Sequence, residues 1–331
     1  MPPPEAPARR RLLRWAATGA AVLAAPAWAA FPERTLTLVV PTPPGGPVDR
    51  VARAVAQPWS QALGQPMVVD NRAGAAGKLG VQAALRAPRD GYTLLAVSPS
   101  ITSVNPVVDK AAGYDPLKDF EPLGIAATNA GVVAVRAGLP VASMAELVAY
   151  GRADPERLTY ASFGVGTSLH LQSEELLQTL GIRARHVPYK GESQALNALV
   201  AGEVDLMAYV TAPVVPFVEA RRVRALAATA ARRWPLLPEV PSFAETGVPS
   251  LRGYDYHSWV GFVLPAGVPG EATARIAAAL QVALAQPALQ ATLDAQGLAL
   301  GSGGAAGLRQ AVAGELDRNR RLLATGRVVL D

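Results

Sequence analysis

Short apolar runs alternate with segments of helical spacing along most of the chain. Runs typical of buried strands occur at residues 36–40 (LTLVV), 67–70, 92–97, 131–135, 158–162, 204–210 and 224–229. Helices are predicted between them at residues 48–63, 80–87, 171–180 and 192–201, with another beginning near residue 144. Strands that alternate with helices in this way are typical of α/β folds, so we predict mainly parallel sheets flanked by helices.

The pattern falls into two blocks, each with a Gly-rich loop between a strand and a helix near its start. A chain of 331 residues also exceeds what a single core usually fills, which favours two domains. Residues 258–264 (SWVGFVL) indicate another buried strand, followed by helices at 271–285, 288–295 and 305–323. Because that strand could return to the first sheet, we predict a discontinuous first lobe of residues 30–128 plus 254–331 and a second lobe of residues 129–253.

The N-terminus has the layout of a secretory signal peptide. A basic stretch precedes a short apolar segment, and Ala27-Trp28-Ala29 matches a small-x-small cleavage site. A membrane anchor is the alternative, but the apolar segment is about half of the roughly 20 residues that cross a bilayer. We therefore predict a signal peptide at residues 1–29 and a periplasmic protein. The paired arginines leave the Sec and the twin-arginine export routes both open. The basic stretch comprises Arg9, Arg10, Arg11 and Arg14.

Charge and cysteine content exclude several kinds of function. Residues 1–29 contain four Arg and one Glu, so without them the net charge falls from +5 to +2. No stretch interleaves basic with aromatic residues, and we expect no nucleic-acid partner. The chain has no cysteine, which excludes disulfides and thiolate metal sites. Since His170, His186 and His257 show no metal-ligand spacing, we expect no metal and no cofactor.

The first Gly-rich loop, TPPGGPVD (residues 42–49), is a candidate anion site. It lacks both the Lys-Ser/Thr of a phosphate-binding P-loop and the G-x-G-x-x-G of dinucleotide-binding folds. Gly45 and Gly46 allow the backbone to approach a ligand closely, and Pro47 suits the first helical position. The free N–H groups of the next turn suit a ligand carboxylate. Because Asp49 would repel that carboxylate, we expect a water between the two, or a ligand amine or hydroxyl that faces Asp49. The alternative is a tight turn with Asp49 as a first-turn acid.

The second loop, FGVGTSLH (residues 163–170), repeats this arrangement. Gly164 and Gly166 supply the turn, and Thr167 and Ser168 lie where a helix N-cap is expected, with hydroxyls beside free N–H groups. Ordinary capping explains this loop when it is taken alone. A ligand clamped between two lobes explains both loops at once and needs no catalytic residue.

An exported α/β hydrolase acting through His170 or His257 is the competing hypothesis. The chain has no G-x-S-x-G nucleophile motif, and no two carboxylates are placed as an acid and a base. A lone histidine after a Gly-rich loop is more often a packing or hydrogen-bonding residue than a base. We therefore expect no enzymatic activity.

Many motifs, in the same order, resemble the periplasmic solute-binding receptors of tripartite tricarboxylate transporters, also called Bug or TctC-like receptors. The resemblance implies a Venus-flytrap of two α/β lobes, a monomer, that captures a small organic carboxylate and delivers it to membrane permease subunits. A di- or tricarboxylate, an amino acid or an aromatic acid would fit, and docking on a sensor kinase is the alternative to transport. The motifs are FPERTLTLVVPTPPGGPVD, LGQPMVVDNRAGAAG, APRDGYTLL, YDPLKDFEPLG, LTYASFGVGTSLH, HVPYKG, GEVDLMAYV, RALAATAARRWPLLPEVPSFAETG and SWVGFVLPAGVP.

The resemblance also implies the site residues, since in this family backbone N–H groups and ordered waters at the two loops hold the ligand carboxylate. In two places the chain departs from the family. Pro47 and Val48 replace small hydroxyl residues, and Tyr209 replaces a frequent Asp. Because both changes remove polar groups, we expect a ligand with an apolar or aromatic body on which Tyr209 stacks. The implied site comprises Thr42, Pro43, Pro44, Gly45, Gly46, Pro47, Asp49, Ser98 and Ser100 in the first lobe, and Ser162, Gly164, Gly166, Thr167, Ser168, His170 and Tyr209 in the second.

Overall fold

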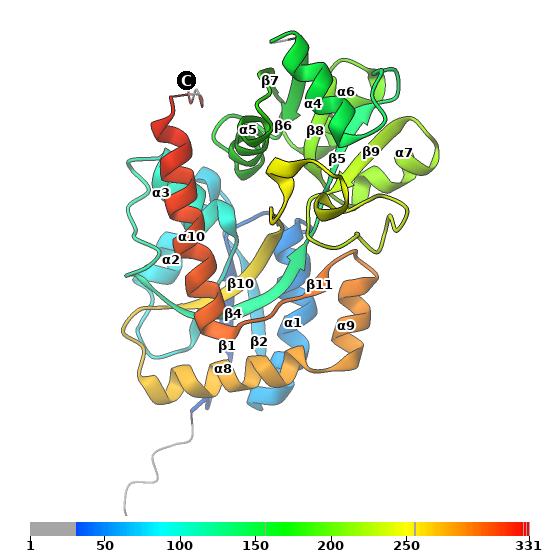
Figure 1. The fold of residues 1–331 in the computed structure, drawn as a ribbon. Coiled ribbons are helices and arrows are strands. Elements are labelled where there is room, and N and C mark those ends of the chain that lie inside the picture. Colours follow the sequence, from blue (N-terminus) through cyan, green and yellow to red (C-terminus); the bar gives the residue numbers. More distant parts are fainter. Residues whose placement is uncertain (1–30, 156, 255, 327, 329, 331) are drawn as a thin grey trace, which may run out of the picture.

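The computed structural model describes residues 31–326 except 156 and 255, together with 328 and 330. The predicted signal peptide, residues 1–29, lies outside the described residues. This part of the chain forms two sheets, of six and five strands, each flanked by helices (Figure 1). The predicted two-lobed α/β fold is therefore confirmed.

The first sheet has the strand order β11-β4-β10-β3-β1-β2. Alternate residues of β1 point to opposite faces, so that Leu36 and Leu38 join one buried cluster and Val39 another. Burial on both faces explains why this strand is an unbroken apolar run. The strands are β1 (Leu36–Val40), β2 (Met67–Asn71), β3 (Thr93–Val97), β4 (Phe120–Asn129), β10 (Ser258–Pro265) and β11 (Ala299–Leu300).

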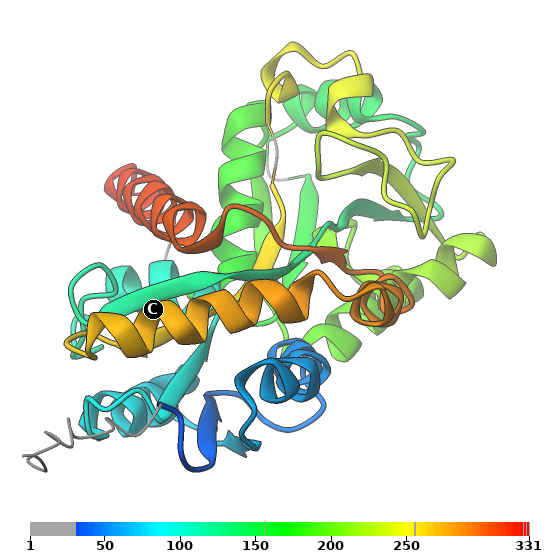
Figure 2. The ribbon, with the colours of Figure 1, turned by 90° about the horizontal axis from the view of Figure 1, so that it is seen from below.

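Helices cover both faces of the first sheet. The cluster around Leu38 includes side chains of α1, α8 and α9, and the cluster around Val39 includes side chains of α2 and α10. Seen from below in Figure 2, α8 packs against both α1 and β4. The helices are α1 (Pro47–Leu63), α2 (Lys78–Arg86), α3 (Asn105–Val108), α8 (Gly270–Leu284), α9 (Pro287–Asp294) and α10 (Gly304–Ala324).

The second sheet has the strand order β7-β6-β8-β5-β9 and its own large buried cluster. Its helix α5 begins directly after the second Gly-rich loop, where Thr167 caps it by accepting the His170 N–H at 3.3 Å. The strands are β5 (Val132–Arg136), β6 (Leu158–Ser162), β7 (Ala184–Pro188), β8 (Leu206–Val210) and β9 (Val223–Ala228). The helices are α4 (Met144–Ala153), α5 (Ser168–Leu180), α6 (Glu192–Ala201) and α7 (Val215–Glu219).

Both sheets are mixed, so the prediction of mainly parallel sheets was wrong. In the first, β1 is parallel to β2 and β3, whereas β10 is antiparallel to β3 and β4. In the second, β6 is parallel to β7 and β8, whereas β5 is antiparallel to β8 and β9. The reason is that β5 and β10 are the first strands after the chain crosses from the other sheet. They begin at the edge that faces the other sheet, where the neighbouring parallel strands end, and are therefore antiparallel to those strands.

The chain crosses between the sheets twice within the described residues. It passes from β4 to β5 after Asn129 and returns from β9 to β10 after Ala228. Helix α10 also connects the two halves, because Arg318 lies 3.7 Å from Glu175 of α5. The exact lobe boundaries stay a prediction.

No single helix in the described ranges is long and apolar enough to cross a membrane. The consecutive helices α8 and α9, which are bent by 68° at their junction, meet that length and composition only as a pair. Residues of both helices, including Leu280 and Leu293, are fully buried in the first lobe's cluster with α1.

Candidate functional site

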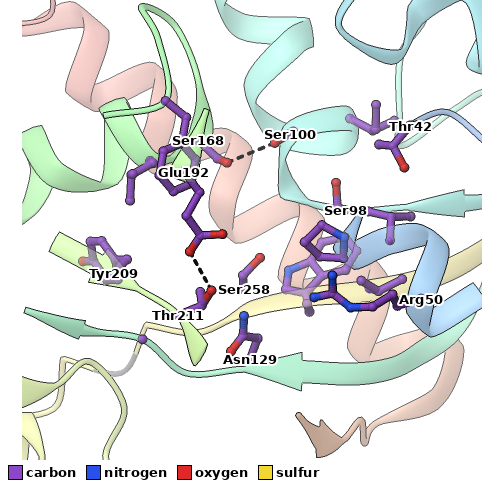
Figure 3. Close-up of a pocket in the computed structure, with 18 of the residues that line it drawn as sticks. Thr42, Arg50, Ser98, Ser100, Asn129, Ser168, Glu192, Tyr209, Thr211 and Ser258 are labelled. Atoms are coloured by element: carbon purple, nitrogen blue, oxygen red, sulfur yellow. Dashed lines mark hydrogen bonds between the residues drawn. The ribbon is translucent and has the colours of Figure 1, made fainter. Parts of the chain in front are cut away.

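A cavity of about 480 Å³ lies between the two sheets (Figure 3). Its walls come from the segments that follow β1, β2 and β3 in the first lobe and those that follow β6, β7 and β8 in the second. The carboxyl ends of parallel strands are the usual place for ligands in open α/β sheets. The topology therefore brings the two predicted loops to one cavity.

The buried side chain of Asp49 stabilises the conformation of the first Gly-rich loop through hydrogen bonds. Its carboxylate accepts the Gly45 N–H at 2.8 Å, the Arg53 Nε–H at 3.0 Å and the Asn71 Nδ2–H at 2.8 Å, and only 2% of the residue is exposed. Although burial alone would raise the pKa of Asp49, the hydrogen bonds from Arg53, Gly45 and Asn71 lower it. Gly45 needs to be glycine, since its φ is +80°. Asp49 thus holds the loop and does not line the cavity.

The beginning of α1 faces the cavity. Pro47 and Val48 line it, and the first turn of a helix leaves N–H groups without intrahelical partners. The preceding Thr42 also lines the cavity, and its buried Oγ1 has no hydrogen-bond partner among the described residues. These groups are donors aimed at a place where an acceptor can bind.

Arg50 adds a cation that the sequence interpretation overlooked. Its guanidinium donates to the Gly45 carbonyl at 2.9 Å, and the side chain lines the cavity from the first turn of α1 (Figure 3). It is the one Lys or Arg among the described residues that line this cavity. A guanidinium beside helical N–H groups favours an anionic ligand group.

The second lobe contributes the beginning of α5. Ser168 and Leu169 line the cavity from the first turn, while Thr167 turns inward to cap the helix. Ser168 Oγ lies 3.0 Å from Ser100 Oγ of the first lobe, so a hydrogen bond joins the two lobes at the edge of the cavity (Figure 3).

The stacked rings of His170 and His186 pack next to the second Gly-rich loop. His170 Nδ1 accepts the Gly166 N–H at 3.1 Å, and its ring stacks on His186 with centroids 3.9 Å apart. His186 Nε2 lies 2.6 Å from Ser162 Oγ. The pKa of both histidines is lowered to about 4, by burial at His186 and by burial together with the neighbouring His186 at His170. Both rings are therefore neutral near pH 7, which leaves His170 Nδ1 free to accept.

Tyr209 lines the cavity with an unusual backbone. Its φ is +58°, a left-handed conformation that costs a non-glycine residue about 1–2 kcal/mol. Its hydroxyl lies 3.2 Å from that of Tyr254, and its ring meets Tyr256 edge to face at 4.7 Å. Burial raises the pKa of Tyr209 far above its ordinary value, so the hydroxyl is neutral. Strain of this kind concentrates at ligand sites.

Glu192 is the one carboxylate among the described residues that line the cavity. It opens α6, and its Oε1 accepts the Thr211 hydroxyl at 2.8 Å. Asn129 and Ser258 are opposite each other in the register of β4 and β10 and line the same wall (Figure 3). This polar wall was also absent from the sequence interpretation, because its members come from four separate segments.

The structure divides the predicted site residues into two sets. A second cavity of about 420 Å³ adjoins the first, and Ser100 and Ser168 line both. Those lining the first are Thr42, Pro43, Pro47, Ser98, Ser100, Ser168 and Tyr209. Those outside it are Pro44, Gly45, Gly46, Asp49, Ser162, Gly164, Gly166, Thr167 and His170, of which Gly166 and Thr167 line the second cavity.

The rest of the cavity wall is largely apolar. Among the described residues, no three His, Asp or Glu side chains come together as metal ligands would. Aromatic rings make up much of the apolar wall, and a cavity of this kind with a few polar groups is typical of small-molecule sites. The rings are those of Phe163, Tyr209, Tyr256 and Trp259.

Two α/β lobes with helix N-termini facing a shared cavity define the class of two-lobed solute-binding proteins. Within that class, the chain belongs to the tripartite tricarboxylate transporter family receptors, TctC, whose family model matches residues 51–326. A UPF0065 protein from the tcbD-tcbE intergenic region of Pseudomonas sp. is 37% identical over 303 residues, which cover 90% of this chain and 88% of that protein.

Solved structures show the same similarity. Rpa4515 from R. palustris, solved with adipate, is 34% identical, has a TM-score of 0.74 and is matched over 89% of this chain and 98% of its own. MatC from Rhodopseudomonas palustris, solved with bound malate, is 30% identical, with a TM-score of 0.72 and coverage of 88% and 100%. The periplasmic binding protein BugD is 30% identical, with a TM-score of 0.71 and coverage of 90% and 99%.

Proposed function

We propose that this chain is a periplasmic receptor that binds a small organic carboxylate between its lobes and delivers it to the permease subunits of a tripartite tricarboxylate-type transporter. Family membership supports the receptor role, and the periplasmic relative BugD supports the location. The ligands of two relatives, adipate and malate, support a carboxylate. One observation carries the proposal. The N-termini of α1 in the first lobe and α5 in the second lobe both line the same cavity.

The ligand carboxylate is bound by donors from both lobes. In the first lobe these are the Arg50 guanidinium, the unpartnered Thr42 hydroxyl and the first-turn N–H groups of α1. In the second lobe they are the Ser168 hydroxyl and the first-turn N–H groups of α5. Donors on both sides of the ligand stabilise the arrangement in which the lobes meet, and two chain crossings serve as the hinge.

The receptor acts as a monomer and catalyses no reaction. His170, the residue on which a hydrolase would depend, is buried, accepts the Gly166 N–H and lies outside the cavity lining. His257 lines a different cavity with Glu315 and Arg318. Sensing through a kinase needs the same binding step, so deletion of the genes for the permease subunits separates the two roles. Transport predicts that uptake of the ligand stops.

A thermal-shift screen of the processed protein tests the binding step. We expect at least one compound among dicarboxylates, tricarboxylates, amino acids and aromatic acids to raise the melting temperature, because a ligand that binds only the folded state stabilises it. Arg50→Gln should reduce that shift, whereas Arg86→Gln, an exposed arginine of α2, should leave it unchanged. A screen in which no compound stabilises the protein contradicts the proposal.

A further inference from the structure

The cavity holds a carboxylate for which the described residues provide no ion-pair partner. Glu192 is half-buried at the start of α6, and its carboxylate accepts a hydrogen bond from the neutral Thr211 hydroxyl at 2.8 Å. Within the described residues, no Lys or Arg forms an ion pair with it, and the cavity's one cation, Arg50, belongs to the other lobe and bonds to the Gly45 carbonyl. A carboxylate left unpaired in a closing cavity is costly, so a ligand group that compensates it gains affinity.

The two charges give the cavity two chemically different ends. In the first lobe, Arg50 and the first-turn N–H groups of α1 supply donors only, which suit a ligand carboxylate. Glu192 supplies acceptors, and a second ligand carboxylate facing it would be repelled. A dianion therefore satisfies one end and opposes the other, whereas a zwitterion satisfies both.

Aromatic rings strengthen the preference for a cation at the Glu192 end. Figure 3 places Tyr209 and Thr211 beside Glu192, and Phe163 and Tyr256 line the same cavity. The faces of such rings attract an ammonium group. Asn129 and Ser258 also line this end, and the Ser258 hydroxyl can accept a further hydrogen bond.

We propose that the ligand is an amino carboxylate whose ammonium group is received by Glu192. This inference rests on the proposed carboxylate receptor and names the class of ligand that it selects. The ligand carboxylate lies toward Arg50, the ammonium lies toward Glu192 and Thr211, and the rings contact the carbon chain. Glu192 is then the specificity-determining residue of the site.

Isothermal titration with compounds that differ in one substituent tests this inference. Aspartate, malate and succinate carry an amino group, a hydroxyl group and a hydrogen at the same carbon, and phenylalanine and phenylpropanoate form a second pair with an aromatic body. In at least one series, the amino compound should bind on the order of tenfold more tightly than its counterparts, since its ammonium group adds a charge-assisted bond to Glu192. Glu192→Gln should abolish that preference and raise the affinity for succinate, whose second carboxylate Glu192 repels.

Two controls separate recognition from folding. Glu192→Gln keeps the size of the side chain and its bond to Thr211, and its melting temperature should match that of the original protein. Glu203→Gln, an exposed residue just beyond α6, should leave every affinity unchanged. Succinate or malate binding as tightly as aspartate, with no effect of Glu192→Gln, overturns the inference but not the receptor. Binding of no compound overturns both.

Discussion

Ser100 Oγ and Ser168 Oγ lie 3.0 Å apart and join the two lobes directly. Ser100 is the first residue of the short helical segment Ser100–Val104 that follows β3, and Ser168 is the first residue of α5. Both side chains line the central cavity and the adjoining one, so their bond lies where the lobes meet. The bond stabilises the arrangement in which both sets of donors face the same ligand.

Ser100→Ala removes this bond without leaving a buried charge. We expect weaker ligand binding by about 0.5–1.5 kcal/mol, the usual net value of a neutral hydrogen bond. Small-angle scattering of the ligand-free protein should show a larger radius of gyration, because fewer contacts hold the lobes together. Ser193→Ala, which changes an exposed serine of α6, is the control. Equal affinity and equal size in both variants would contradict a role for the bond.

The two glycines of the first loop should respond differently to substitution. Gly45 has a φ of +80°, whereas Gly46 has a φ of −70° and room for a Cβ at 3.4 Å from the Pro43 carbonyl. Gly45→Ala should therefore lower the unfolding free energy by about 1–2 kcal/mol, and Gly46→Ala should change it little. Urea unfolding of the two variants measures the difference. Similar losses of unfolding free energy would contradict the left-handed conformation of Gly45.

Asp49→Ala should loosen the first loop. The substitution removes the acceptor of the Gly45, Arg53 and Asn71 donors, of which Arg53 is half exposed and Asn71 also donates to the Thr42 carbonyl. Losing these hydrogen bonds costs about 1–3 kcal/mol of unfolding free energy. Thermal unfolding measures the loss, and ligand affinity should fall with it because the loop carries Thr42 and Pro43. A variant as stable as the original would show that Asp49 does not hold the loop.

Acidification should destabilise the second lobe. The pKa values of His170 and His186 are about 4 in the folded protein, below the ordinary 6.5, so between these values the unfolded chain takes up protons that the folded chain does not. The stabilisation is full above pH 6.5 and is lost as the pH falls toward 4. Urea unfolding across this range should show the decline, and His170→Asn with His186→Asn should flatten it. An unchanged slope in that double variant would assign the effect to other groups.

Strands and helices with clear patterns were predictable from the sequence, and three strands were not. β4 contains Pro122 and Gly124, and its pairing with β10 shifts register, so its apolar pattern is interrupted. β7 is a partly exposed edge strand with the polar sequence ARHVP. β11 is only two residues long. The antiparallel pairs were missed because they depend on how the chain crosses between lobes, which no local pattern records.

Part of the site was predictable from the two Gly-rich loops and from the family resemblance. Thr42 and Ser168 line the cavity from the loops, and Ser98, Ser100 and Tyr209, which the resemblance implied, line it from other segments. Arg50 and Glu192 were missed, since each belongs to a helix where a charged residue is ordinarily solvated. What distinguishes Arg50 and Glu192 from other charged residues is that the N-termini of α1 and α6 line the same cavity, which is visible only in the folded structure.

Isothermal titration of the processed protein against organic carboxylates, with Arg50→Gln and Ser168→Ala measured beside it, tests the central claim most directly. A receptor of this kind should bind at least one carboxylate with a stoichiometry near one, and both variants should weaken binding while keeping the original melting temperature. The absence of binding to every di- and tricarboxylate, amino acid and aromatic acid would contradict the account, as would full affinity in both variants.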